Sequence, residues 1–355
     1  MKKLNLTLAG ALLSSAAASL ADDRPPNILL ILTDDQGYHD LSIQGATDFE
    51  TPNADRIAHS GVRFTAGYVT SPQCAPSRAG LMTGVSQSRF GFMDNKNQNG
   101  IPPRDVVQIL PEYLKDAGYT TGVIGKWHIG TLRASLIDSI SRDVSVDNYV
   151  VLPDNHPSER GFDYLLLHDA GTSHYFPYRA GGKQWMEVRG REPRLEQMLE
   201  GETEPYFLDD LPEDTYLTDY FSEQGAEFIR RNTGEPWFLF LSYNAPHTPM
   251  NAKAEKLEKY AHIEDSGRRH LVAMMDSLDE GIGLVLESLE ETGQLENTII
   301  WYLSDNGAPS HINHSRNDPF SGKKGDMHEG GIRVPFLFFM TSLPLCVQDR
   351  CWTIP

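Results

Sequence analysis

The stretch that decides the fold is residues 27–33, NILLILT, in which Asn27 and Thr33 bracket an unbroken run of isoleucine and leucine. A short continuous apolar run is typical of a strand that is buried on both faces of a parallel sheet. Two carboxylates, Asp34 and Asp35, follow it directly. We therefore expect a central buried strand whose carboxyl end carries two acidic side chains.

A helix-then-strand pattern repeats after this first strand. A short helix is predicted to begin at Thr51-Pro52 and to end at Gly61. Longer helices are expected at 110–117, 215–232 and 268–292, and the strands that follow them at 120–124, 237–243 and 298–303. Successive βαβ units of this kind predict an α/β fold with a mostly parallel central sheet flanked by helices.

The composition is that of a globular protein with an acidic surface. The 355 residues are 39% hydrophobic and 23% charged, and the formal net charge is −18. Such a charge argues against non-specific binding to nucleic acid or to anionic membranes. It leaves an anionic substrate open, because a single site can be locally basic.

The N-terminus has the pattern of a secretory leader. Lys2 and Lys3 precede an apolar, alanine-rich stretch at 4–20, and the small residue Ala21 stands at the expected cleavage point. We predict a signal peptide at 1–21 and a periplasmic or secreted protein. A membrane anchor is the alternative, although polar residues within the stretch weaken it as a spanning helix. No later stretch is apolar enough to span a bilayer, so we do not expect an integral membrane protein.

Polar side chains follow each of the four predicted central strands. They are Asp34 and Asp35, Lys126 and His128, His247, and Asp305 and Asn306. Ligands of open α/β sheets bind outside the carboxyl ends of the strands, so we expect these side chains to meet at one edge. The carboxylates and the amide suit a hard cation such as calcium or magnesium. Asp34-Asp35 and Asp305-Asn306 are each, taken alone, also common turn formers.

The segment Cys74-Ala75-Pro76-Ser77-Arg78 is the second candidate for chemistry. Pro76 suits the first turn of a helix, which would place Cys74 at a helix N-terminus, where an anion is favoured. A buried structural cysteine and a thiolate nucleophile are the alternatives for Cys74. The chain has three cysteines, and Cys346 and Cys351 could pair with each other, which would leave Cys74 unpaired.

At these residues the sequence resembles the type I sulfatase family of the alkaline phosphatase-like superfamily. Cys74, Pro76 and Arg78 match its Cys-x-Pro-x-Arg signature, which a maturation enzyme reads. Residues 125–128 (GKWH) and 325–335 (GDMHEGGIRVP) are similar to two further family elements, and the two acidic pairs are matched as well. The matches follow the family's order along the chain.

The resemblance implies a nucleophile made by modifying Cys74. In the family, a formylglycine-generating enzyme or an anaerobic sulfatase-maturating enzyme converts this cysteine to formylglycine. One hydroxyl of the hydrated aldehyde attacks sulfur, and the second then expels sulfate. The remaining catalytic roles fall, by resemblance, on Arg78 (orienting the hydrated aldehyde), Lys126 and Lys324 (binding sulfate oxygens), His128 (base) and His247 (general acid).

The same resemblance implies one cation, calcium rather than magnesium. Its ligands would be Asp34, Asp35, Asp305, Asn306 and the modified Cys74. Two of the implied roles have simpler alternatives. His247 precedes Thr248-Pro249 and suits a turn, and Lys324 could be one half of a solvated pair with Lys323.

The domain organisation implied by the resemblance is a catalytic domain at 22–340 after the signal peptide. The family's smaller C-terminal domain is expected to be largely missing, and 341–355 is an atypical tail. Two segments, 133–156 and 171–183, look like loops that determine the substrate, and within the second Ser173, His174 and Tyr175 are candidates for substrate contact.

The predicted function is that of a sulfuric ester hydrolase, a sulfatase acting on a sulfated carbohydrate or an aryl sulfate. One alternative is a phosphoesterase of the same superfamily, which normally carries serine or threonine as nucleophile and binds two metals. The other is a truncated, inactive relative that binds calcium or sulfated glycan. The signature at Cys74 argues against the phosphoesterase.

Overall fold

The computed structural model describes most of the chain between Arg24 and Thr341. The described ranges are 24–95, 100–133, 149–151, 153–168, 173–187, 195–208 and 211–341. The predicted signal peptide, the tail beyond Thr341, and Cys346 and Cys351 lie outside the described residues.

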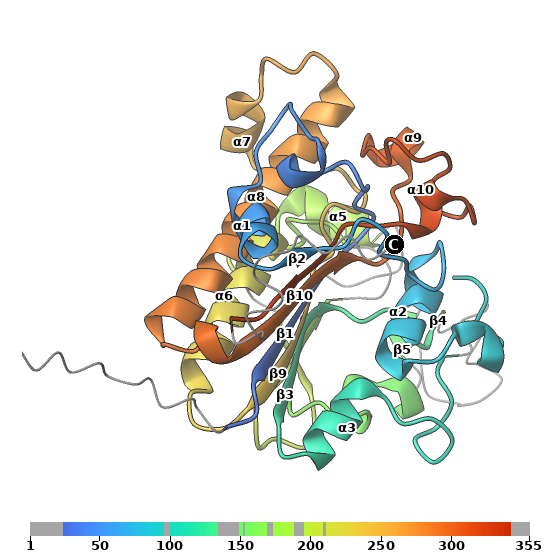
Figure 1. Ribbon diagram of the computed structural model, residues 1–355, viewed down its shortest axis with the longest axis vertical. Coiled ribbons are helices and arrows are strands. Elements are labelled where there is room, and N and C mark those ends of the chain that lie inside the picture. Colours follow the sequence, from blue (N-terminus) through green and yellow to red (C-terminus); the bar gives the residue numbers. More distant parts are fainter. Residues whose placement is uncertain are drawn as a thin grey trace, which may run out of the picture.

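A nine-stranded sheet in the order β2-β11-β10-β1-β9-β3-β6-β7-β8 forms the centre of the molecule (Figure 1). Its strands are β1 (Asn27–Thr33), β2 (Val62–Arg63), β3 (Thr120–Lys126), β6 (Tyr164–His168), β7 (Leu195–Met198), β8 (Tyr206–Leu208), β9 (Trp237–Ser242), β10 (Thr298–Ser304) and β11 (Phe336–Phe339). The five strands from β10 to β6 are parallel, whereas the pairs at both edges are antiparallel. The predicted α/β sheet is thus confirmed as a mixed sheet with a parallel centre.

Helices cover both faces of this sheet. The helices of the described residues are α1 (Pro52–His59), α2 (Cys74–Thr83), α3 (Leu110–Asp116), α5 (Ala180–Glu187), α6 (Leu217–Arg231), α7 (Ala254–Lys259), α8 (Ser266–Glu291), α9 (Ser310–Asn313) and α10 (Glu329–Ile332). Figure 1 shows α1, α6 and α8 on one side of the sheet and α2 and α3 on the other. Among the described residues, no helix is long and apolar enough to cross a membrane.

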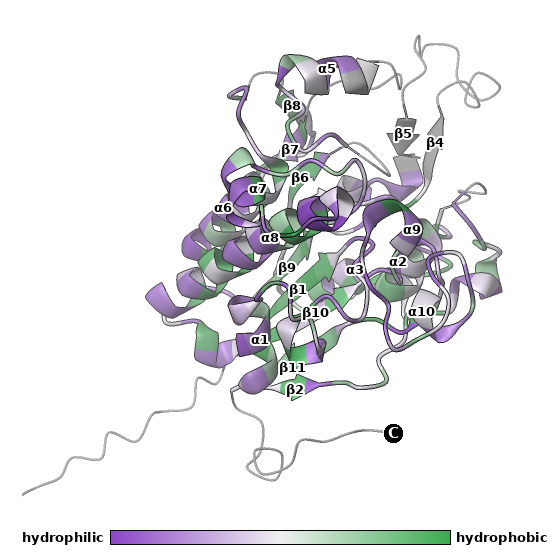
Figure 2. Cartoon of the chain, turned by 90° about the horizontal axis from the view of Figure 1, so that it is seen from above, coloured by the Kyte–Doolittle hydropathy of each residue, from purple (hydrophilic) through white to green (hydrophobic). Residues whose placement is uncertain are grey.

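Strand β1 contributes to both core layers, as its continuous apolar run predicts. Leu29 and Ile31 belong to the core beneath α1, α6 and α8, while Leu30 and Leu32 belong to the core beneath α2 and α3. Each side chain is at most 5% exposed, and full burial of a leucine or isoleucine contributes about 1.5–3 kcal/mol. Figure 2 shows largely hydrophobic central strands between helices that carry many hydrophilic residues.

The strand register aligns the carboxyl ends of the parallel strands. Thr33 of β1 pairs with Ser304 of β10, and Ser242 of β9 pairs with Gly125 of β3. The residues that follow these pairs therefore leave the sheet at one edge. This alignment brings Asp34-Asp35 after β1 next to Asp305-Asn306 after β10, as the sequence predicts.

The segment at 133–156 contains more regular structure than a loop. Strand β4 (Thr131–Arg133) pairs with β5 (Tyr149–Val151) in an antiparallel two-stranded sheet, and 134–148 lie outside the described residues. In the second expected loop, 171–183, the helix α5 begins at Ala180. The loop prediction is therefore wrong at those positions, because the periodicity of such short elements is too brief to identify in the sequence.

Candidate active site

Cys74 is the first residue of α2, at the carboxyl edge of the sheet. All residues of this helix except Leu81 are buried, and Cys74 is 1% exposed. Gly84 ends the helix in the left-handed conformation, with φ 63°. The helix N-terminus directs backbone N–H groups and positive potential towards the position of Cys74, which favours an anion there.

The carboxylates that follow β1 and β10 lie beside Cys74. Its Sγ is 3.6 Å from Oδ1 of Asp34. The backbone N–H of Asp35 donates to Oδ1 of Asp305 at 3.2 Å, and Nδ2 of Asn306 donates to Oδ1 of Asp35 at 2.7 Å. The structure therefore brings all four predicted oxygen-bearing residues together.

Two lysines from distant segments converge on the same carboxylates. Nζ of Lys126, at the end of β3, is 2.5 Å from Oδ2 of Asp34. Nζ of Lys324, in the loop before α10, donates to Sγ of Cys74 at 2.9 Å and lies 2.6 Å from Oδ1 of Asp35. Lys324 is thus part of the cluster and is not half of a solvated pair with Lys323.

Arg78 is fully buried one helical turn after Cys74. Its Nε donates to Oδ2 of Asp305 at 2.9 Å, and its Nη1 donates to the carbonyl of Lys126 at 2.7 Å and to Oγ of Ser242 at 2.6 Å. Ser242 in turn donates to the Lys126 carbonyl at 2.6 Å. These charge-assisted bonds fix the guanidinium relative to β3 and β9. The sequence reasoning missed Ser242, whose signal was a lone hydroxyl at the end of an apolar strand.

The buried charges shift one another's pKa values. Burial alone would raise the pKa of Asp34 and of Asp35, but Lys126 and Lys324, respectively, hold these pKa values below the usual range. The pKa of Asp305 is raised by burial and by the neighbouring Asp34. Three carboxylates and three cationic side chains thus share one water-poor site.

Burial raises the pKa of the Cys74 thiol to about 12, although Lys126 and Lys324 act to lower it. An unmodified Cys74 therefore remains a protonated thiol at neutral pH, so the thiolate alternative fails for the resting cysteine. The alternative of a plain structural cysteine is also inadequate, because Sγ contacts an ammonium group and a carboxylate rather than apolar atoms alone.

His247 lies on the loop after β9, opposite Asp35. Its Nε2 is 3.4 Å from Oδ2 of Asp35, and its Nδ1 is 2.6 Å from the carbonyl oxygen of Thr248. The carbonyl can only accept, so Nδ1 carries a proton and Nε2 faces the site. Burial lowers the pKa of His247, although Asp34 and Asp35 oppose this shift.

Tyr175 has a different place from the one expected. It is fully buried, and its hydroxyl lies 2.7 Å from the carbonyl oxygen of Asn244 and 2.8 Å from that of His247. The expectation of substrate contact is therefore wrong for Tyr175. Its hydroxyl instead holds the loop that carries His247, a partnership between segments that local sequence does not reveal.

Backbone strain is concentrated in this site. Asp35 and His128 both have positive φ, 64° and 55°, which is uncommon for residues with a side chain.

His128 is 7% exposed. Burial, together with Lys126 and Arg78, lowers its pKa well below the usual value, so its imidazole is neutral and can accept a proton.

The donor set fits a divalent cation. Oδ1 of Asn306 is buried and has no hydrogen-bond partner within the described part of the chain. Ligand atoms of Asp34, Asp35, Cys74 and His247 lie within 4.8 Å of one another. Buried carboxylate and amide oxygens are the donors that calcium and magnesium prefer.

The fold and the site together define a member of the alkaline phosphatase-like superfamily, in which a helix N-terminus and carboxylates meet at the carboxyl edge of a mixed sheet. The model of the sulfatase family matches residues 26–344. The chain belongs to the sulfatase family.

Relatives and solved structures agree with this placement. The chain is 32% identical to N-acetylgalactosamine-6-sulfatase of Canis lupus familiaris over 94% of its own length and 60% of that protein, and 31% identical to the Homo sapiens enzyme over 88% and 56%. The structure described as Ps i-CgsB in complex with k-i-k-neocarrahexaose aligns with a TM-score of 0.75 and 32% identity, covering 90% of this chain and 66% of that one. The chain thus spans less than two thirds of the length of these proteins.

Proposed function

We propose that this protein hydrolyses a sulfuric ester, with a sulfated carbohydrate or an aryl sulfate as substrate. The observation that carries the proposal is the position of Cys74, which begins α2 with its Sγ 2.9 Å from Nζ of Lys324 and 3.6 Å from Oδ1 of Asp34. A carbohydrate substrate is supported by the two mammalian relatives named N-acetylgalactosamine-6-sulfatase and by the k-i-k-neocarrahexaose bound in the aligned structure.

The nucleophile in this proposal is formylglycine made from Cys74 by a maturation enzyme, either the formylglycine-generating type or the anaerobic type. Its hydrated aldehyde supplies a hydroxyl that attacks sulfur and a second hydroxyl for release of sulfate. Maturation before folding is supported by the burial of Cys74, which is 1% exposed. Such maturation also agrees with the predicted export to the periplasm or the exterior.

The cationic side chains stabilise the charge that develops on sulfate. Lys126 and Lys324 flank the position of Cys74 and bind sulfate oxygens, while Arg78, held by Asp305 and Ser242, orients the nucleophile. Because these groups are fixed by hydrogen bonds before substrate arrives, little reorganisation is needed in the transition state.

The two histidines move protons. His247 donates from Nε2 to the leaving alcohol, because its Nδ1 is engaged by the Thr248 carbonyl and cannot turn towards the substrate. His128, neutral through burial, accepts the proton of the second hydroxyl. Burial lowers the pKa of His247, and the neighbouring carboxylates of Asp34 and Asp35 oppose that shift and so favour its protonated form.

One cation, calcium in preference to magnesium, would be held by Asp34, Asp35, Asp305, Asn306 and the modified Cys74. It supplies charge neutralisation for the sulfate and for the clustered carboxylates. We assign His247 to proton transfer rather than to this ligand set, because calcium prefers oxygen over imidazole nitrogen.

The test combines mass spectrometry of the Cys74 peptide with an assay of sulfate release. The chain is co-expressed with a maturation enzyme, and p-nitrophenyl sulfate and p-nitrophenyl phosphate are compared as substrates. We expect the aldehyde in place of the thiol, and release of sulfate that is absent in Cys74→Ala. Unmodified Cys74 with no turnover would refute the mechanism. Cleavage of the phosphate alone would favour the phosphoesterase.

A further inference from the structure

A buried arginine outside the catalytic cluster ties helix α8 to the loop after β1. Arg268, in the first turn of α8, is 4% exposed. Its Nη1 donates to Oδ1 of Asp40 at 2.7 Å, and its Nε and Nη2 donate to the two carboxylate oxygens of Asp48 at 2.8 and 2.9 Å. A guanidinium fork held by two carboxylates has a fixed orientation.

Asp40 extends this connection to the segment after α9. Its second oxygen, Oδ2, accepts bonds from the hydroxyl of Ser315 and from the backbone N–H of Arg316, the latter at 2.9 Å. Asp40 is fully buried, and Ser315 is 2% exposed. One carboxylate therefore joins α8, the loop after β1 and the segment 313–316.

The segment 313–316 in turn contacts the backbone of the proposed cation-binding loop. Nδ2 of Asn313 donates to the carbonyl of Asp35 at 3.0 Å, and the N–H of Gly37 donates to Oγ of Ser315 at 2.8 Å. A Cβ on Gly37 would lie 2.1 Å from the carbonyl oxygen of Arg316, so only glycine permits this close approach. The connection from Arg268 thus reaches the residue whose carboxylate belongs to the site.

We propose that Arg268, acting through Asp40 and Ser315, is a positioning residue for the proposed cation site. Asp35 has a positive φ, and such a conformation persists only where surrounding contacts fix it. The long, largely buried helix α8 provides a rigid support for those contacts. This inference rests on the proposed function, because it assumes that Asp35 binds the cation.

The test is calorimetric titration of the full, chelator-treated chain with calcium chloride. Outer contacts that orient metal ligands typically change metal affinity about 10–100-fold, so we expect a loss of that size in Arg268→Met. Removing a positive charge near the site would strengthen calcium binding if electrostatics alone acted. The direction of the change therefore separates positioning from a charge effect.

Three further variants complete the experiment. Arg268→Lys keeps the bond to Asp40 and should restore part of the affinity. Ser315→Ala removes only the hydroxyl, so it should fold and still weaken calcium binding. Arg269→Met is the matched control, since Arg269 bonds to the carbonyl of Ile263, and it should bind like the wild type. Thermal melts in chelator confirm that each variant is folded.

The outcomes distinguish this inference from the proposed function. Weakened calcium binding in Ser315→Ala and in folded Arg268→Met, with Arg269→Met unchanged, supports the positioning role. Wild-type or tighter binding in Ser315→Ala and Arg268→Met overturns that role and leaves the cation site intact. If Asp305→Asn binds calcium as the wild type does, both the cation site and the positioning role are overturned.

Discussion

The buried ion pair between Arg160 and Glu112 gives a sharp test of what holds the α2 and α3 side of the fold together. Arg160 is 2% exposed and Glu112 is fully buried. Nε of Arg160 donates to Oε1 of Glu112 at 2.8 Å, and its Nη2 donates to the carbonyl of Val107 at 2.9 Å. Oε2 of Glu112 accepts the N–H of Ile109 at 2.7 Å, at the start of α3.

Replacing Arg160 by methionine keeps most of its volume but leaves the Glu112 carboxylate buried without its cation. Loss of one partner of a buried pair costs about 3–5 kcal/mol. That is a large part of the roughly 5–15 kcal/mol by which such domains are stable. We therefore expect the free energy of unfolding to fall by about 3–5 kcal/mol in Arg160→Met. The double variant Arg160→Met/Glu112→Gln should recover part of the loss, because no unpaired charge remains.

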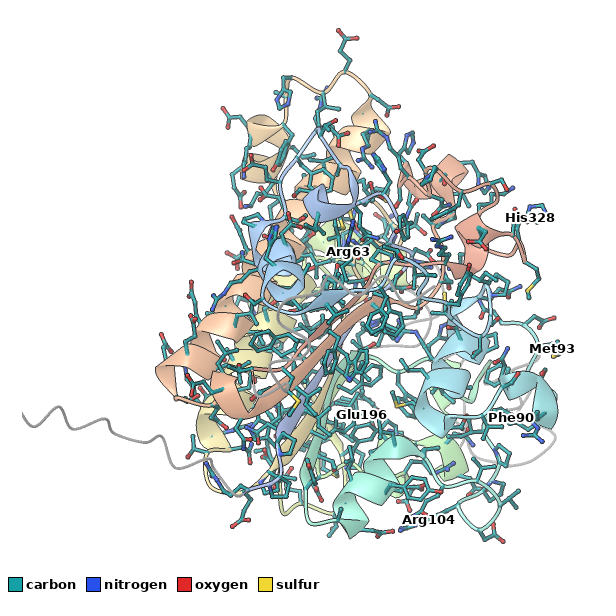
Figure 3. All side chains as sticks on the ribbon, in the orientation of Figure 1. Arg63, Phe90, Met93, Arg104, Glu196 and His328 are labelled. Carbon is teal, nitrogen blue, oxygen red and sulfur yellow. The ribbon has the colours of Figure 1, made fainter. Side chains whose placement is uncertain are left out.

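The assay is equilibrium urea unfolding followed by tryptophan fluorescence, with Arg104→Met as the control. Arg104 pairs with Asp116 at 3.1 Å, but both side chains are more than half exposed, and Figure 3 shows Arg104 at the edge of the molecule near α3. An exposed pair contributes about 0–1 kcal/mol. If Arg160→Met lost no more stability than Arg104→Met, the reasoning from the buried pair would be refuted.

Three other predictions concern the site. Lys324→Ala should lower kcat for sulfate release by at least about 100-fold, because removal of one preorganised charge-stabilising group lowers kcat by a factor of about 10²–10³. Lys323→Ala is the control, and equal kcat values in the two variants would contradict the assignment. Gly125→Ala should destabilise the fold, because φ is 102° and a Cβ would lie 2.0 Å from the Ser242 carbonyl oxygen; an unchanged melting temperature would count against the register. Calcium should raise the melting temperature of the wild type but not of Asp305→Asn. At a calcium concentration of 100 times Kd, the free energy of unfolding of the wild type should rise by about 2.7 kcal/mol. Equal rises in melting temperature in the two proteins would remove Asp305 from the site.

Much of the fold and the site could be predicted from local sequence. The apolar run at 27–33 predicts a strand buried on both faces, because only a central parallel strand needs apolar side chains in both directions. Prolines in the first turn of a helix, such as Pro52 of α1 and Pro76 of α2, are also local signals. The antiparallel edges could not be predicted, because strands as short as β2 and β8 carry too little periodicity.

The residues that support the site were harder to predict than the residues that form it. Ser242, Tyr175 and Arg268 act through partners far along the chain. In the sequence alone, each of them could equally be an ordinary core or helix residue. Only the assembled structure shows that a serine orients Arg78 or that a tyrosine holds the His247 loop. These residues are identified by contacts between distant parts of the chain, which no local sequence pattern predicts.

By itself, the sequence determined the α/β class of this protein and its place in the sulfatase family, because a two-sided strand and a Cys-x-Pro-x-Arg motif are both local patterns. The tertiary structure decided which charges meet. Lys324 reaches Cys74 across 250 residues, and Arg78 is directed onto Asp305 rather than into solvent. The physical reason is that such pairings depend on strand register and on how loops pack at the sheet edge, and these are properties of the whole core.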